Sequence, residues 1–120
     1  MNRNLVAAGA GLAVAAVMLG AFGTHALTGR LDARALGWWQ TAVQYQAWHA
    51  LAVLVLGLHG AAWVRRPGWI LALGALIFAA TLYAMALGAP RWFGAVTPLG
   101  GLLMIVGWTM LAWRAVRARD

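Results

Sequence analysis

Four long stretches without a charged residue dominate this chain of 120 residues. A helix rises about 1.5 Å per residue and the hydrocarbon core of a bilayer is about 30 Å thick, so roughly 20 apolar residues cross it once. Each stretch is long enough for one crossing. The sequence therefore predicts four membrane-spanning helices within the charge-free limits 4–29, 35–64, 67–90 and 92–113.

The composition excludes a water-soluble fold. Hydrophobic residues make up 64% of the chain and charged residues 9%, with a mean hydropathy of +0.79. Too few polar side chains remain to cover a soluble surface. Four spans leave only about 40 residues for connections and ends, fewer than a further domain needs. We expect residues 1–120 to form one all-α integral membrane domain, a compact antiparallel four-helix bundle with spans at about 5–27, 43–63, 69–89 and 95–113.

The first apolar run has an alternative interpretation as a secretory signal, because Arg3 precedes it. The run from Leu5 to Leu27 is 23 residues long, whereas the core of a signal peptide has about 7–15 residues. We expect this segment to remain as a helix.

The charge of +7 comes from nine arginines and two aspartates. These arginines are scattered between apolar spans and form no basic stripe, so nucleic acid is not an expected partner. Membrane lipids, or another membrane protein, are the expected partners. The absence of cysteine excludes disulfides and Cys-ligated metal or haem sites.

Arginines near a span resist translocation, so their distribution predicts orientation. The two ends and the second loop carry six arginines, and the first and third loops carry three: Arg3, Arg65, Arg66, Arg114, Arg117 and Arg119 against Arg30, Arg34 and Arg91. This bias predicts both termini in the cytoplasm, and in a bacterial cell the membrane would be the plasma (inner) membrane.

A short interfacial helix is expected between the first two spans. Arg30 and Arg34 lie four residues apart and would face water together. The opposite face would meet the acyl boundary through Leu31, Ala35, Trp38 and Trp39.

Polar residues inside the spans are the candidate functional residues, because a polar group in hydrocarbon must find a partner. On the second span, five residues at intervals of three and four share one face: Thr41, Gln44, Tyr45, Trp48 and His49. Gln46 lies off this face. His25 closes the first span, Thr81 and Tyr83 lie late in the third, and Thr97 opens the fourth. In an antiparallel arrangement all of these residues fall in the outer half of the membrane.

Two functions fit this cluster. Its members could bind haem, a metal, a quinone or a lipid headgroup, with the candidate ligand-binding residues being His25, Tyr45, Gln46, His49, Thr81, Tyr83 and Thr97. Alternatively they satisfy one another and set the helix register in a structural or accessory membrane protein, at about 0.6 kcal/mol per contact. No Asp or Glu accompanies them, so no residue is assigned a catalytic role and the cofactor is left open. Small residues should bring the helices close together: Gly9, Ala13, Ala16, Gly20, Gly23, Gly74, Gly100, Gly101 and Gly107.

Several of these segments, taken in order, resemble a known family. They are residues 20–27 (GAFGTHAL), 45–51 (YQAWHAL), 82–83 (LY), 97–101 (TPLGG) and 107–108 (GW). The combination is similar to domain of unknown function 423, small bacterial inner-membrane proteins of the YgdD type related to animal transmembrane protein 256. The resemblance implies a four-helix membrane protein and implies no particular activity.

Overall fold

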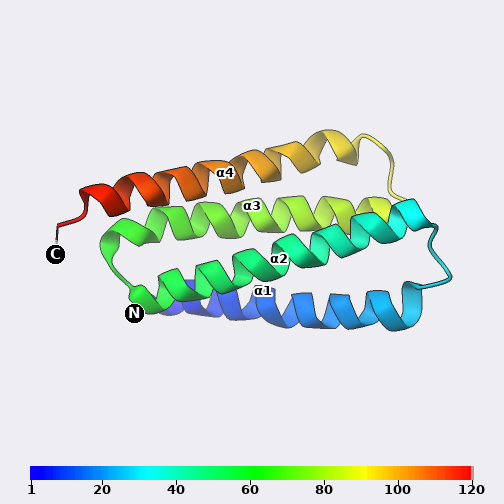
Figure 1. Cartoon of the computed structure of the whole chain (residues 1–120), viewed down its shortest axis with the longest axis horizontal. Coiled ribbons are helices and arrows are strands. Elements are labelled where there is room, and N and C mark those ends of the chain that lie inside the picture. The colour runs from blue at the N-terminus through cyan, green and yellow to red at the C-terminus, as the bar shows by residue number, and fades with distance from the viewer. Residues whose placement is uncertain (120) are drawn as a thin grey trace.

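The computed structural model describes residues 1–119 as helices joined by short connections (Figure 1). They run antiparallel, and both termini lie at the same end of the molecule. In order the elements are α1 (Arg3–Phe22), the π-helical turn η1 (Gly23–Leu27), α2 (Ala33–His59), α3 (Ala62–Ala86) and α4 (Phe93–Arg117). The expected all-helical fold is thereby confirmed.

The predicted interfacial helix is wrong, because residues from Ala33 onward form the first turns of α2. The Asp32 carboxylate accepts a hydrogen bond from the Ala35 backbone N–H at 2.8 Å and so caps this helix. The apolar side chains expected at the acyl boundary instead pack on a protein cluster built around Leu27, Trp39 and Ala86. The apolar side chains of this segment are therefore buried against other parts of the protein, where the sequence predicted that they would face the membrane surface.

The turn between the second and third helices also lies earlier than the arginines suggested. Only Gly60 and Ala61 separate α2 from α3. Gly60 has a φ of 74°, a left-handed conformation that glycine adopts without strain, and its N–H bonds the Leu56 carbonyl. Arg65 and Arg66 consequently lie in the first turns of α3.

The helices form an open row rather than the expected compact bundle. Each packs against its neighbour in the chain, α1 touches α3 slightly, and α1 and α4 make no contact. The molecule is elongated, 52 × 26 × 18 Å. Figure 1 shows this order, with α1 and α4 at opposite edges.

Glycines explain which helices approach closely. A Cβ on Gly9 of α1 would lie 2.5 Å from the Leu54 backbone nitrogen in α2. A Cβ on Gly57 of α2 would lie 2.6 Å from the Val6 backbone nitrogen in α1. Between α3 and α4, a Cβ on Gly100 would lie 2.5 Å from the Phe78 nitrogen. In lipid, where no hydrophobic force joins helices, such close backbone contact drives their association. These glycines favour pairing of successive helices.

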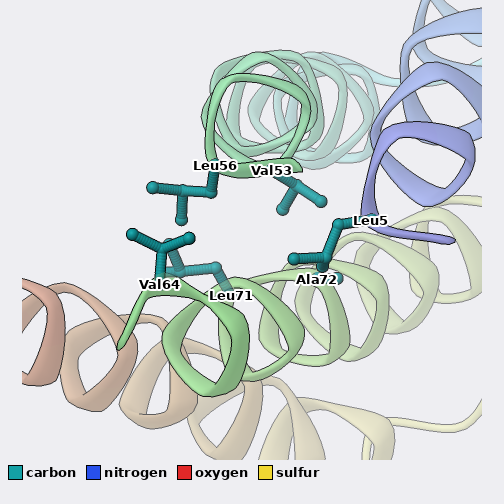
Figure 2. Close-up of a cluster of buried hydrophobic side chains, with 6 residues drawn as sticks. All are labelled: Leu5, Val53, Leu56, Val64, Leu71 and Ala72. Carbon is teal, nitrogen blue, oxygen red and sulfur yellow. The ribbon is translucent and has the colours of Figure 1, made fainter. Parts of the chain in front are cut away.

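A cluster of buried aliphatic side chains joins the first three helices near the end that bears the termini. Leu5, Val53 and Leu71 have no exposed surface. In Figure 2, Leu5 from α1 lies beside Val53 of α2 and Ala72 of α3, and the cluster continues through Leu56, Val64 and Leu71. α4 contributes none of the buried members of this cluster.

Within residues 1–119, three segments are long and apolar enough to cross a membrane: Arg3–Leu27, Ala62–Ala86 and Phe93–Arg117. The 27-residue α2 is longer but is not among them. It carries the largest share of the polar residues described below.

Candidate functional site

Gln46 of α2 ties three helices together. Its Nε2 donates to the Leu12 carbonyl of α1 at 2.9 Å. Its Oε1 accepts from the Tyr83 hydroxyl of α3 at 2.7 Å. Gln46 is 4% exposed, so both ends of a buried amide are satisfied by different helices.

His49 of α2 lies in a second polar contact. Its Nδ1 is 2.7 Å from the Tyr45 carbonyl oxygen, and its Nε2 accepts a hydrogen bond from the Trp108 indole of α4 at 3.0 Å. A carbonyl oxygen only accepts, so Nδ1 carries the hydrogen and Nε2 is the acceptor. The neutral imidazole uses both nitrogens in this contact, which links α2 to α4.

Thr81 and Thr97 form a third contact, between α3 and α4. Their hydroxyl oxygens are 2.7 Å apart. Each hydroxyl also lies within hydrogen-bonding distance of a carbonyl in its own helix: Thr81 of Ile77 and Phe78, and Thr97 of Phe93. This pair needs no outside partner.

Trp39 adds a contact that the sequence interpretation placed at the membrane boundary. Its indole is 3% exposed and donates to the Leu19 carbonyl of α1 at 2.9 Å. It packs against Tyr83 with ring centroids 4.6 Å apart and the two rings tilted by 57°. A Cβ on Gly23 would lie 2.5 Å from its Nε1, so the glycine in η1 makes room for this ring.

The seven candidate residues do not meet at one point. Tyr45 packs on Phe78 and stacks on the His49 ring, and its hydroxyl has no hydrogen bond within residues 1–119. His25 is exposed in η1 and likewise has none there. The others form the separate contacts described above, and within residues 1–119 the hydrogen bonds of His49 go to the Tyr45 carbonyl and Trp108 rather than to His25 or Tyr83.

The polar face expected on α2 is also wrong in part, because Gln44 and Trp48 are exposed. Residues three and four apart make up the buried face, and Gln46 is central to it: Trp39, Ala42, Gln46, His49, Ala50, Val53, Leu56 and Gly57. Small and aliphatic neighbours determine which side of the helix packs, and polarity does not. Since α2 begins at Ala33 and not near Val43, His49 lies close to the middle of this helix.

The sequence interpretation missed the partners of the candidate residues, above all Trp108 and the Leu12 carbonyl. Trp108 could have been found as a hydrogen-bond donor deep inside an apolar span, where an indole N–H must be satisfied. A helical carbonyl gives no signal in a sequence.

The polar contacts described above offer few free side-chain atoms that could bind a metal ion. Within residues 1–119, no group of three or more His, Cys, Asp or Glu side chains is placed to hold a metal ion. None of their buried side-chain nitrogen or oxygen atoms lacks a hydrogen-bond partner. The buried polar side-chain atoms of residues 1–119 therefore all have hydrogen-bond partners within the protein.

An open groove of about 550 Å³ lies between the end of α1 with η1 and the beginning of α2. Its lining includes Gly20, Thr24, Trp39, Gln40, Thr41 and Gln44. None of the seven candidate residues lines it.

Comparison with known proteins gives a consistent result. The family model described as "Protein of unknown function (DUF423)" matches residues 19–101. A UPF0382 membrane protein of Staphylococcus haemolyticus is 43% identical over 95 residues, covering 77% of this chain and 78% of the relative. The UPF0382 membrane protein YwdK of Bacillus subtilis is 38% identical over 110 residues, covering 88% and 89%.

The UPF0382 inner membrane protein YgdD of Escherichia coli K12 is 38% identical over 107 residues, covering 86% of this chain and 82% of the relative. No solved structure matches the chain.

Proposed function

The chain belongs to the DUF423 family of membrane proteins, and we propose that it acts as a structural or accessory component of the bacterial plasma membrane. Its internal polar side chains hold its own helices in register, and it packs against lipid or a larger membrane assembly. This proposal assigns it no chemical reaction.

One observation carries the proposal: the polar groups inside the molecule are paired with one another. Gln46 uses its amide nitrogen and oxygen on two different helices, and His49 uses both ring nitrogens. A residue that binds haem or a metal must offer a free lone pair, which neutral His49 lacks in this arrangement. Interhelical pairs of this kind contribute about 0.6 kcal/mol each in membrane proteins.

The alternative is a carrier of haem, a metal, a quinone or a lipid headgroup at the same cluster. This function would require the Trp108 indole to give up its hydrogen bond to His49, or His25 and Tyr45 to bind the ligand without His49. These two functions predict different contents for the purified protein.

The test is to extract the protein gently with its surrounding lipid and record its absorption spectrum, metal content and bound quinone. The structural function predicts no haem, metal or quinone in stoichiometric amount. A stoichiometric cofactor that is lost in His49→Gln would overturn it, because an amide replaces the hydrogen bonds of imidazole but not its coordination.

We also infer that all four helices cross the membrane, with both termini in the cytoplasm. α2 connects the far end of α1 to the near end of α3 and packs against both, so it must cross if they do. Six arginines at the end that bears the termini against three at the other support this orientation.

A further inference from the structure

An open groove of about 580 Å³ runs between α3 and α4, beginning at the end of the molecule that bears both termini. Arg65 and Arg66 of α3 and Arg114 of α4 line this groove. Ile70 and Leu73 of α3 and Leu103 of α4 line it further toward the middle of the helices. Its lining therefore changes from basic to apolar along the helix axes.

The length of this gradient suits an amphiphile. Leu73 lies eight residues beyond Arg65, which is about 12 Å along a helix, and Leu103 lies eleven residues before Arg114, which is about 16 Å. Trp69, an amphipathic side chain, lies between the two zones on α3. A headgroup at the basic end would place the first carbons of its acyl chains on the apolar floor.

The basic end lacks acidic partners within the described residues. Asp32 is the only acid in residues 1–119, and it caps α2 at the opposite end of the molecule. Arg65 and Arg66 are exposed. Arginine matches the geometry of a phosphate through paired N–H donors, so an anion that carries phosphate complements this end.

Arg114 is held in place by a feature of α3. Pro67 lies inside α3 and has no backbone N–H, so the Trp63 carbonyl one turn earlier loses its usual helical donor. Arg114 donates to that carbonyl at 3.3 Å. This bond uses one N–H of the guanidinium and fixes the side chain at the groove, while its other donors can meet a phosphate.

We propose that this groove binds one anionic glycerophospholipid, with the phosphate at Arg65, Arg66 and Arg114 and the acyl chains on Ile70, Leu73 and Leu103. The inference does not depend on the polar pairs of the proposed function, which use other residues. Its failure would leave their role untouched.

The test titrates the full chain in detergent with phosphatidylglycerol, and with phosphatidylcholine of the same acyl chains, and counts bound lipids by native mass spectrometry. Binding in detergent does not depend on membrane orientation. The variant is Arg65→Gln with Arg66→Gln, and the matched control is Arg30→Gln with Arg34→Gln, which removes equal charge at the other end. We expect phosphatidylglycerol to bind the variant about tenfold or more weakly and the control like the parent. Equal weakening in both would overturn the site.

A second arm separates a lipid from free phosphate. Water-soluble glycerol phosphate should not displace bound phosphatidylglycerol at matched concentration, because it lacks the chains that contact the apolar floor. Equal displacement would overturn the lipid assignment. Circular dichroism should show that the double variant keeps the helix content of the parent. The single variant Arg66→Gln makes a milder change at the same site, and we expect it to lose less phosphatidylglycerol affinity than the double variant.

Discussion

The imidazole of His49 and the amide of Gln46 show how a largely apolar helix can hold polar groups. Each side chain is buried, and each uses one donor and one acceptor on separate partners. In hydrocarbon the alternative is an unsatisfied polar group, so these pairs restrict how α2 can rotate against its neighbours.

Replacing His49 should separate hydrogen bonding from imidazole chemistry. His49→Leu leaves the Trp108 indole without its acceptor and should lower the free energy of unfolding by about 1–2 kcal/mol. His49→Gln keeps an acceptor and a donor and should cost less. Unfolding in mixed detergent micelles measures both.

The double variant His49→Leu with Trp108→Phe is the control for this pair. Removing both partners leaves no unpaired group between them, so its cost should be smaller than the sum of the two single costs. Strictly additive costs would show that the indole and the imidazole are not coupled.

Gln46 and Tyr83 should differ in the same assay because they make different numbers of contacts. Tyr83→Phe removes one hydrogen bond, whereas Gln46→Leu removes both interhelical bonds and strands the Tyr83 hydroxyl. We expect Gln46→Leu to cost at least about 1 kcal/mol more than Tyr83→Phe. A Tyr83→Phe protein less stable than Gln46→Leu would contradict the bridging role of the amide.

At the scale of helices, close approach is local to particular glycines. Gly9 faces the Leu54 backbone in α2, whereas nothing lies within 4 Å of a Cβ on Gly11, two residues later. Gly100 faces Phe78 backbone atoms at 2.5 Å, while the nearest atom to a Cβ on its neighbour Gly101 is 3.9 Å away. The same residue type therefore has different roles within one helix.

Alanine substitution should report this difference. Gly9→Ala and Gly100→Ala force rigid backbones apart and should lower the free energy of unfolding by about 1–3 kcal/mol. Gly11→Ala and Gly101→Ala are the matched controls, and they should be neutral or stabilising by up to about 1 kcal/mol through helix propensity. Equal effects at facing and non-facing glycines, measured in the same detergent, would exclude glycine contact as the cause of helix pairing.

At the scale of the molecule, the open row leaves α1 and α4 without contact. The hydrogen bond between His49 and Trp108 joins α2 to α4, although the backbones of these two helices do not approach each other. The shape exposes much of both edge helices to whatever surrounds them.

Single cysteines should test whether all four helices cross the membrane, since the chain has no cysteine of its own. We expect Ala33→Cys and Ala89→Cys to react with an impermeant maleimide in intact cells, because they lie at the end opposite the termini. Ala62→Cys and Ala118→Cys should react only after the membrane is permeabilised. The same labelling pattern for Ala33→Cys and Ala62→Cys would show that α2 does not cross.

The sequence by itself determined the helical class, the four helices and their alternating directions. Apolar length and the arginines between the spans are properties of consecutive residues, and a helix satisfies its own backbone hydrogen bonds within one segment. Family membership followed from short motifs such as residues 45–51, which the comparisons confirm.

Only the tertiary structure decided the open row, the first turns of α2 and the pairing of the polar residues. Gln46 lies off the face predicted from the spacing of polar residues within its own helix. Its hydrogen-bond partners, Leu12 and Tyr83, lie 34 and 37 residues away in the sequence, on other helices. Which side chains meet depends on the rotation and spacing of neighbouring helices. Backbone contacts at residues such as Gly9 and Gly100 set that spacing, and a sequence pattern does not contain the distance between two helices.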